Sequence, residues 1–280
     1  MAAAISEAAV SERPLLPGVG TLSAGPADAA ETLVYLHGWG GCKELWWNAL
    51  ADLAGEFRGI ALDLPGTGGT PLPPGLATMA DLARWVRETC TRLGLESVTL
   101  VGHSLGGNLA AQVALDHPAL VRRLVLVDAA LEPEHLPPRS RLPLSPRYGL
   151  AALRLMRLAS LPLAAVGARV PHDHPGGYWR SYARRTRWYL TSNTDAALQV
   201  QLRALSENPL DAARLAALRM PLLIVHGEWD AVVPVARARA LAAALPHARL
   251  ALFPTAHHCP MDTDPPAFAR LLRAFCGESA

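Results

Sequence analysis

The stretch Val98-Thr99-Leu100-Val101-Gly102-His103-Ser104-Leu105-Gly106 decides the fold of this 280-residue chain. A strand-like apolar run is followed directly by Gly-x-Ser-x-Gly, and a helix-like run then extends over residues 105–116. This order is typical of a nucleophile elbow, a tight turn from a strand into a helix that raises a serine hydroxyl above a sheet. Such a turn is strained and crowded, so a Cβ at residue 102 or 106 would clash with the flanking strand or helix. We therefore expect Ser104 to be a nucleophile at the end of a buried strand.

The rest of the chain alternates short apolar runs with segments of helical spacing. Strands are expected at residues 32–36, 59–62, 98–101, 124–127, 222–225 and 250–253, and helices at 44–53, 78–93, 105–116, 234–244 and 265–276. Nearly continuous apolar strands that alternate with helices are typical of an α/β fold, in which a mostly parallel sheet has helices on both faces. Residues 1–30 are weakly patterned, and we expect them to contribute one or two edge strands at most.

The alternation is interrupted once, over residues 131–219, where no strand-like run occurs. A loop of this length without structure of its own is uncommon in a compact domain. The sequence therefore predicts a helical lid at residues 131–219, inserted between two core segments at residues 31–130 and 220–280. The predicted lid carries 13 arginines and six acidic residues, which gives it a net charge of +7.

Composition and overall charge narrow the class of protein further. Hydrophobic residues make up 51% of the chain and charged residues 18%, which favours a sizeable core over global disorder. A net charge of +2 is too small to indicate a nucleic-acid partner. No continuous apolar run reaches the roughly 18 residues of a membrane span, and no basic segment followed by an apolar stretch begins the chain. We expect a cytoplasmic protein without stable membrane insertion, and the sequence leaves its oligomeric state open.

The cysteines and histidines give little indication of a metal site. The four cysteines lack the spacing of a metal site or a disulfide framework, and we interpret them, Cys259 included, as small buried side chains. His172 and His174 flank Asp173 in a proline-containing segment, but no further ligand cluster accompanies them. We therefore expect no metal ion and no other cofactor.

Five motifs, in one order along the chain, resemble those of the α/β-hydrolase family. They are Leu36-His37-Gly38-Trp39-Gly40, Asp63-Leu64-Pro65-Gly66-Thr67-Gly68, the Gly-x-Ser-x-Gly elbow, Val225-His226-Gly227-Glu228-Trp229-Asp230 and Ala256-His257-His258-Cys259-Pro260. The resemblance extends from about residue 32 to the C-terminus and implies an α/β-hydrolase fold with an inserted lid. Two positions depart from the family's pattern, because relatives commonly have glycine in place of His257 and often have histidine in place of Thr67.

The resemblance implies a catalytic triad of Ser104, Asp230 and His258, in the family's order along the chain. A serine hydroxyl is a weak nucleophile unless a base removes its proton during attack, and His258 is the expected base. Asp230 is expected to hold the imidazole in its productive tautomer and to stabilise the imidazolium. The backbone N–H groups of Trp39 and Leu105 are the expected donors of an oxyanion hole.

Two of these assignments have competitors in the sequence. His257 directly precedes His258, and Asp128 follows the strand-like run at 124–127, where some family members carry their acid. We favour His258 because His257 aligns with the glycine of relatives, and Asp230 because it stands in the commoner position. Asp128 is otherwise expected to form loop hydrogen bonds beneath the lid.

Three further histidines and one lid segment are interpreted as structural. His37 is expected to brace the loop of the first motif, His226 to end a buried strand, and His103 to face away from the nucleophile. Residues 178–189 mix aromatic residues with arginines, which predicts an amphipathic helix that packs its aromatic side chains on the core and leaves its arginines in solvent. The alternatives are that this segment lines an acyl pocket or docks on a membrane surface.

The function expected from this pattern is hydrolysis of a small or medium, largely apolar carboxylic ester through an acyl-enzyme on Ser104. The same residues would serve a carbon–carbon bond hydrolase, a lactonase, a thioesterase or an acyltransferase. A ligand-sensing protein that keeps the fold but turns over negligibly is the alternative from a different class. In each case the expected partner is a small molecule and not a nucleic acid.

Overall fold

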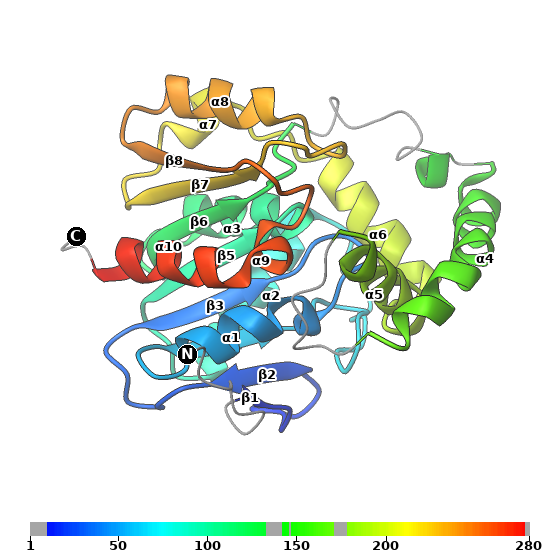
Figure 1. Cartoon of the computed structure of the whole chain (residues 1–280), viewed down its shortest axis with the longest axis horizontal. Helices are drawn as coiled ribbons and strands as arrows, with labels where there is room; N and C mark the ends of the chain where they lie inside the picture. Colours follow the sequence, from blue (N-terminus) through cyan, green and yellow to red (C-terminus); the bar gives the residue numbers. More distant parts are fainter. Residues whose placement is uncertain (1–9, 133–141, 146, 171–177, 278–280) are drawn as a thin grey trace.

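The computed structural model describes residues 10–132, 142–145, 147–170 and 178–277, and its strands form a single sheet (Figure 1). The order in the sheet is β1-β2-β4-β3-β5-β6-β7-β8. The strands are β1 (Val10–Ser11), β2 (Thr21–Ala24), β3 (Thr32–Leu36), β4 (Arg58–Leu62), β5 (Val98–His103), β6 (Val121–Val127), β7 (Leu222–Gly227) and β8 (Ala248–Phe253). The pairs that involve β1 and β2 are antiparallel, and all the others are parallel. The predicted mostly parallel sheet is thereby confirmed.

Helices cover both faces of the sheet, as predicted. Successive strand residues point to opposite sides, so each strand contributes side chains to both apolar layers. In β3, Val34 and Leu36 belong to the hydrophobic cluster formed with α2 (Met79–Arg92), α3 (Leu105–Asp116) and α8 (Val235–Ala244). Leu33 and Tyr35 belong to the cluster on the other face, formed with α1 (Trp47–Leu53) and α10 (Pro265–Gly277). The two apolar layers leave the carboxyl ends of the parallel strands as the edge where loops and polar side chains gather.

Among the described residues between β6 and β7, the structure has four α-helices: α4 (Gly149–Gly167), α5 (Tyr178–Thr191), α6 (Asp195–Ser206) and α7 (Ala212–Leu215). Figure 1 shows α4, α5 and α6 grouped beyond the carboxyl ends of the parallel strands, with α4 farthest from the sheet. The predicted absence of strands here fits the described residues of the segment, apart from an isolated bridge between Asn193 and Thr67 of the core. We call α4, α5, α6 and the turn between α5 and α6 the cap.

One helix of the cap bears on the expectation that the chain has no membrane span. Among the residues that the structure describes, α4 is long and apolar enough to cross a membrane by length and composition alone, with a mean hydropathy of 1.4. A search for continuous apolar runs missed α4 because Arg154 and Arg157 interrupt it. Both arginines form ion pairs with Asp195 at the start of α6, at 3.2 and 3.3 Å. Length and composition by themselves do not place α4 in a membrane.

Candidate active site

Ser104 occupies a strained turn between β5 and α3. Its φ of 53° and ψ of −116° lie in a region that residues other than glycine rarely adopt, and such strain costs about 1–3 kcal/mol. The turn is held by main-chain hydrogen bonds: the Ser104 N–H donates to the carbonyl of Val127 at 2.9 Å, and the N–H groups of Gly107 and Ala130 donate to the Ser104 carbonyl. The predicted elbow is present in the structure.

The two glycines of the motif are required for the reason that the sequence suggested. A Cβ on Gly102 would lie 2.1 Å from the carbonyl oxygen of Gly106, and a Cβ on Gly106 would lie 2.4 Å from the carbonyl oxygen of Leu36. Because these obstacles are backbone atoms, no side-chain rotation relieves the clash. The glycines therefore permit the close approach of β5, α3 and β3 that sets the position of Ser104.

Asp230 and His258 lie in the loops after β7 and β8, and the imidazole Nδ1 is 2.8 Å from the carboxylate Oδ2. The other oxygen of Asp230 accepts hydrogen bonds from the N–H groups of Val232 and Val233 at 2.7 and 3.0 Å. Burial of Asp230 opposes its ionisation, but the charge of His258 and the hydrogen bonds outweigh it and hold the pKa of the carboxyl well below its usual range. Asp230 is therefore an anion at neutral pH, bonded to His258.

Ser104 and His258 line the same cavity, of about 260 Å³. The core contributes the loop around Trp39 to its wall, and the cap contributes Met156 of α4 together with Arg185, Trp188 and Tyr189 of α5. His257, the competitor of His258, has its ring 6.3 Å from that of Trp229. Of the two histidines, His258 is the one that joins Asp230 to the cavity.

The loop that carries Trp39 is held by hydrogen bonds from the core and from the cap. His37 Nδ1 donates to the carbonyl of Gly38 at 2.8 Å while its Nε2 accepts from the Leu64 N–H at 3.0 Å, so His37 braces the loop as expected. From the cap, the Asn193 side-chain amide donates to the carbonyls of Gly40 and Gly41, each at 3.1 Å. The indole N–H of Trp39 itself donates to the carbonyl of Leu198 in α6 at 2.8 Å. Leu105, the other expected donor, begins α3, where N–H groups have no partner within the helix.

Asp128, the competitor of Asp230, also lies close to His258. It directly follows β6 and has a φ of 44°, its Oδ1 accepts from the Gly227 N–H at 2.9 Å, and its buried Oδ2 has no hydrogen-bond partner in the described structure. One ligand atom each of His103, Asp128 and His258 lie within 4.8 Å of one another. Such a spacing is compatible with metal ligands. Nδ1 of His258 is already hydrogen-bonded to Asp230, and we assign no metal here. Burial raises the pKa of Asp128 to about 7.

His226 connects the two carboxylates. Its Nε2 donates to the carbonyl of Val233 at 2.9 Å and lies 3.4 Å from the carboxylate of Asp230. Its Nδ1 lies 3.6 Å from Asp128. His226 lies at the end of a buried strand, as expected. Its ring lies between Asp128 and Asp230, the two acidic residues near His258.

His103 does not face away from the active site, so that expectation was wrong. Its ring centroid lies 4.8 Å from that of His258, it lines the cavity, and its Nε2 donates to the main-chain carbonyl of His258 at 2.7 Å. Burial and the adjacent His258 lower the pKa of His103 far below its usual value, so the ring is neutral. His103 therefore fixes the backbone of His258.

Cys259 is a buried thiol whose pKa is raised by burial, as its interpretation as a small core side chain requires.

Two arginines of α5 attach the cap to the loop that carries His258. Arg184 and Arg185 both bond to the carboxylate of Asp262 in α9 (Pro260–Thr263), the second at 3.1 Å, and Arg184 and Asp262 are each only 2% exposed. The expectation that the arginines of this helix lie in solvent was therefore wrong for Arg184. No local pattern in the sequence indicates this pairing, because the partners are about 80 residues apart and one is an ordinary aspartate.

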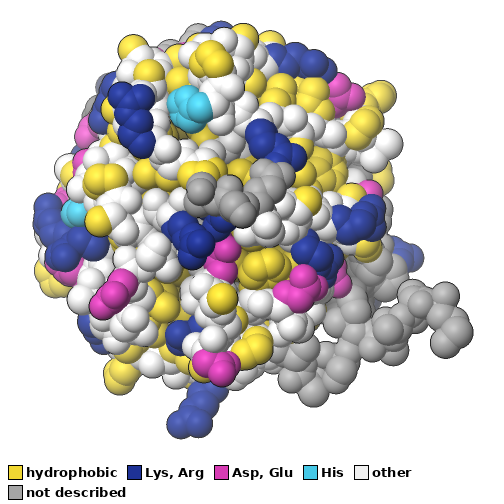
Figure 2. Space-filling view, turned by 90° about the vertical axis from the view of Figure 1, so that its left-hand side faces the viewer, with side chains coloured by type: hydrophobic (Ala, Val, Ile, Leu, Met, Phe, Trp, Pro, Cys, Tyr) yellow, Lys and Arg dark blue, Asp and Glu magenta, His cyan; other side chains and the backbone are white. Residues whose placement is uncertain are grey.

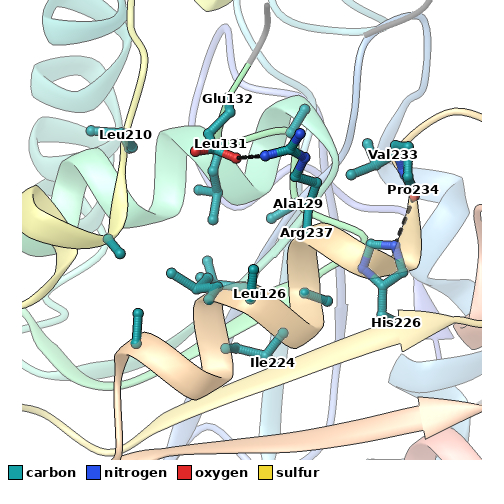
Figure 3. A pocket seen from close by; sticks show the side chains of 16 residues that line it. Leu126, Ala129, Leu131, Glu132, Leu210, Ile224, His226, Val233, Pro234 and Arg237 are labelled. Carbon is teal, nitrogen blue, oxygen red and sulfur yellow. Dashed lines mark hydrogen bonds and ion pairs between the residues drawn. The ribbon is translucent and has the colours of Figure 1, made fainter. Parts of the chain in front are cut away.

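A second cavity, of about 280 Å³, is lined mainly by aliphatic side chains of α8, of the segment after β6, and of the strands β6 and β7 (Figure 3). His226 lies at one side of it, and Arg237 pairs with Glu132 at 3.3 Å (Figure 3). Neither Ser104 nor His258 lines this cavity. The smaller cavity, which Ser104 and His258 both line, is therefore the candidate active site. The histidine pair His172 and His174, which the sequence offered as metal ligands, lies outside the described residues.

The chain belongs to the α/β-hydrolase fold family, whose model matches residues 31–265. It is an α/β-fold hydrolase. It is similar to a putative carbamate hydrolase of a Caulobacter species, with 31% identity over 91% of this chain and 94% of the relative. It is also similar to the pimeloyl-[acyl-carrier protein] methyl ester esterase of Aeromonas hydrophila, with 29% identity over 88% and 95%. Among solved structures, a hydrolase from Pseudomonas aeruginosa matches with a TM-score of 0.76 and 25% identity over 93% and 94% of the two chains.

Proposed function

We propose that the chain hydrolyses a small or medium, largely apolar carboxylic ester through an acyl-enzyme on Ser104. The observation that carries this proposal is the convergence of Ser104 and His258 on one cavity, with Asp230 bonded to His258 at 2.8 Å. Two similar proteins are a putative carbamate hydrolase and a methyl ester esterase, and both activities require attack on a carbonyl carbon that bears a leaving group.

In the first half of the proposed reaction, Oγ of Ser104 attacks the ester carbonyl carbon while Nε2 of His258 takes the hydroxyl proton. The imidazolium is stabilised by the Asp230 anion at Nδ1. The tetrahedral intermediate then breaks its bond to the leaving oxygen, which takes the proton from Nε2 and departs as an alcohol. In the second half, a water molecule gives its proton to Nε2 as it attacks the acyl carbon. Oγ leaves with that proton, and the carboxylic acid is released.

The negative charge of the tetrahedral intermediate requires hydrogen-bond donors that are already in position. We propose the N–H groups of Leu105 and Trp39 for this role. Leu105 lies at the positive end of the α3 dipole, and the loop of Trp39 is held by His37 and by Asn193 of the cap. Loss of one such donor typically lowers the rate by about 10²–10³-fold.

The cap is proposed to be a lid that selects the substrate. Its side chains at the cavity are mostly apolar or aromatic, with Arg185 as a positive exception. A cavity of about 260 Å³ suits a compact acyl group. Because the core chemistry would be common to esters, thioesters and lactones, the shape of this wall decides among them.

Hydrolysis of 4-nitrophenyl esters from acetate to decanoate tests the proposal, with Ser104→Ala as the reference. Turnover that disappears in Ser104→Ala and declines once the acyl chain outgrows the cavity is the expected result. Equal rates in the two proteins would refute a serine mechanism. Absence of turnover by the intact chain would favour a lactone, thioester or diketone substrate, or the ligand-sensing alternative, and the same two proteins are then compared on those substrates.

A further inference from the structure

The outer side of the cap exposes an unusual number of large apolar side chains. In the described chain, α4 and α5 carry seven of the eleven large hydrophobic residues that are exposed. Five lie on α4, namely Leu150, Leu155, Leu158, Leu161 and Val166. Trp179 and Tyr182 of α5 complete the set, which we call the outer cap surface, and Trp179 is 71% exposed. Scattered exposed residues of this kind are ordinary on proteins, but their concentration on two adjacent helices indicates a contact surface.

The pattern of α4 supports the same conclusion. One face of the helix, which includes Leu153, Ala164 and Gly167, is buried in the cap. The opposite face carries Leu155 and Leu158, which are 67% and 62% exposed. A helix that is apolar on both faces is normally enclosed by protein or in contact with lipid. Figure 1 places α4 at the outer limit of the molecule, where the described chain covers only its inner face.

Charge distinguishes the possible occupants of this surface. Residues 142–191 contain eight arginines and a single acidic residue. Arg147, Arg169 and Arg180 are exposed beside the apolar side chains. The face turned away from the cap differs, because basic and acidic side chains are interspersed there (Figure 2). A second copy of the chain would bring two arginine-rich surfaces together, and such like-charge contacts are costly. An apolar surface flanked by cations instead matches the acyl boundary and the headgroups of an anionic bilayer.

We propose that the outer cap surface docks on an anionic lipid surface, with α4 lying in the plane of the interface. The helix does not cross the bilayer in this arrangement, because Arg154 and Arg157 remain paired with Asp195 and the inner face of α4 remains packed in the cap. The leucines enter the headgroup boundary and the exposed arginines contact lipid phosphates. Docking depends on both contributions and weakens as salt screens the charges.

Co-sedimentation of the full chain with vesicles tests this proposal. We expect binding to phosphatidylcholine vesicles that contain phosphatidylglycerol at low salt, and little binding to phosphatidylcholine alone. The triple variant Leu155→Ser, Leu158→Ser, Leu161→Ser should lose binding affinity by about tenfold or more. Each of the three residues is more than half exposed and would lose its contact with lipid. Its circular dichroism and thermal midpoint should match those of the unmodified chain, since exposed positions contribute little to folding.

A charge-matched pair of variants separates docking from non-specific attraction. Replacing Arg147, Arg169 and Arg180 by glutamine should weaken binding by about tenfold or more. Replacing Arg84, Arg92 and Arg270, which are exposed outside the cap, by glutamine changes the net charge equally. This control variant should bind within about twofold of the unmodified chain. Equal losses in the two arginine variants would overturn the proposal, as would an absence of binding to the anionic vesicles. A dimer in solution that the leucine variant converts to a monomer would also overturn it, by showing that a second copy covers the surface.

Discussion

Oδ2 of Asp230 lies 2.8 Å from Nδ1 of His258, although the two residues belong to different loops. This contact leaves Nε2 of the ring as the nitrogen available to the cavity that Ser104 also lines. The main-chain carbonyl of His258 is held at the same time by His103. Both the side chain and the backbone of the proposed base are therefore fixed before any substrate arrives.

The first prediction separates the two adjacent histidines. His258→Ala should lower kcat/KM for a 4-nitrophenyl ester by about 10⁴-fold or more, because the proposed base is removed. His257→Ala should retain activity within about tenfold, since the ring of His257 lies against Trp229. Steady-state kinetics of the two variants provides the measurement. The reverse order of activities would assign the base to His257.

The second prediction concerns the two carboxylates near His258. Asp230→Asn should lower kcat by about 10⁴-fold if Asp230 alone orients the imidazole. Asp128→Asn preserves the acceptor for the Gly227 N–H and a side chain that tolerates a positive φ, and should lower kcat less than tenfold. A double-mutant cycle checks whether the effects are independent. If Asp128 substitutes for Asp230, the single Asp230→Asn variant will keep much more activity than the double variant.

The third prediction follows from the raised pKa of Asp128, which is about 7 in the folded chain. In the unfolded chain an aspartate titrates near 3.9, so between these values the folded state binds more protons and stability falls as pH rises. Asp128→Asn removes this loss. The variant should therefore gain stability relative to the unmodified chain, by about 1–4 kcal/mol, between pH 4.5 and pH 7.5. Urea unfolding of both proteins at the two pH values measures the gain, and a constant difference would contradict the assignment.

The fourth prediction tests the attachment of the cap to the core. Asp262→Asn removes the carboxylate that Arg184 and Arg185 share, and breaking a buried pair costs about 3–5 kcal/mol. Arg273→Gln breaks the pair with Glu56 at the surface, where both side chains are more than a third exposed, and should cost less than about 1 kcal/mol. Denaturant unfolding gives both values. Similar costs for the two variants would mean that the Asp262 pair does not stabilise the cap.

The sequence predicted the elements whose signals are local. The helix expected at 78–93 is observed as Met79–Arg92, and its N-cap residue Thr78 forms a capping box with Asp81. The serine elbow was predicted because strand, glycines and helix are contiguous in the chain. The proposed triad was inferred from the resemblance of its motifs, which follow β5, β7 and β8, to those of the α/β-hydrolase family.

The features that the sequence missed depend on contacts between distant residues. Asp262 has no distinguishing motif in the sequence, and its role depends on the packing of α5, which places Arg184 against it. Asn193 has no motif, yet it donates to two carbonyls of the loop beside Trp39, about 150 residues away. The orientation of His103 was mispredicted because it depends on the path of the loop after β8 and not on the elbow alone. No local periodicity encodes any of these three contacts.

Covalent labelling of Ser104 tests the central claim most directly. The intact chain would be treated with a fluorophosphonate, a reagent that phosphonylates activated serines, and the modified peptide would be identified by mass spectrometry. We predict a single adduct on Ser104 that is formed slowly or not at all in His258→Ala and is absent in Ser104→Ala. An adduct at another residue, or labelling that does not depend on His258, would contradict the proposed mechanism.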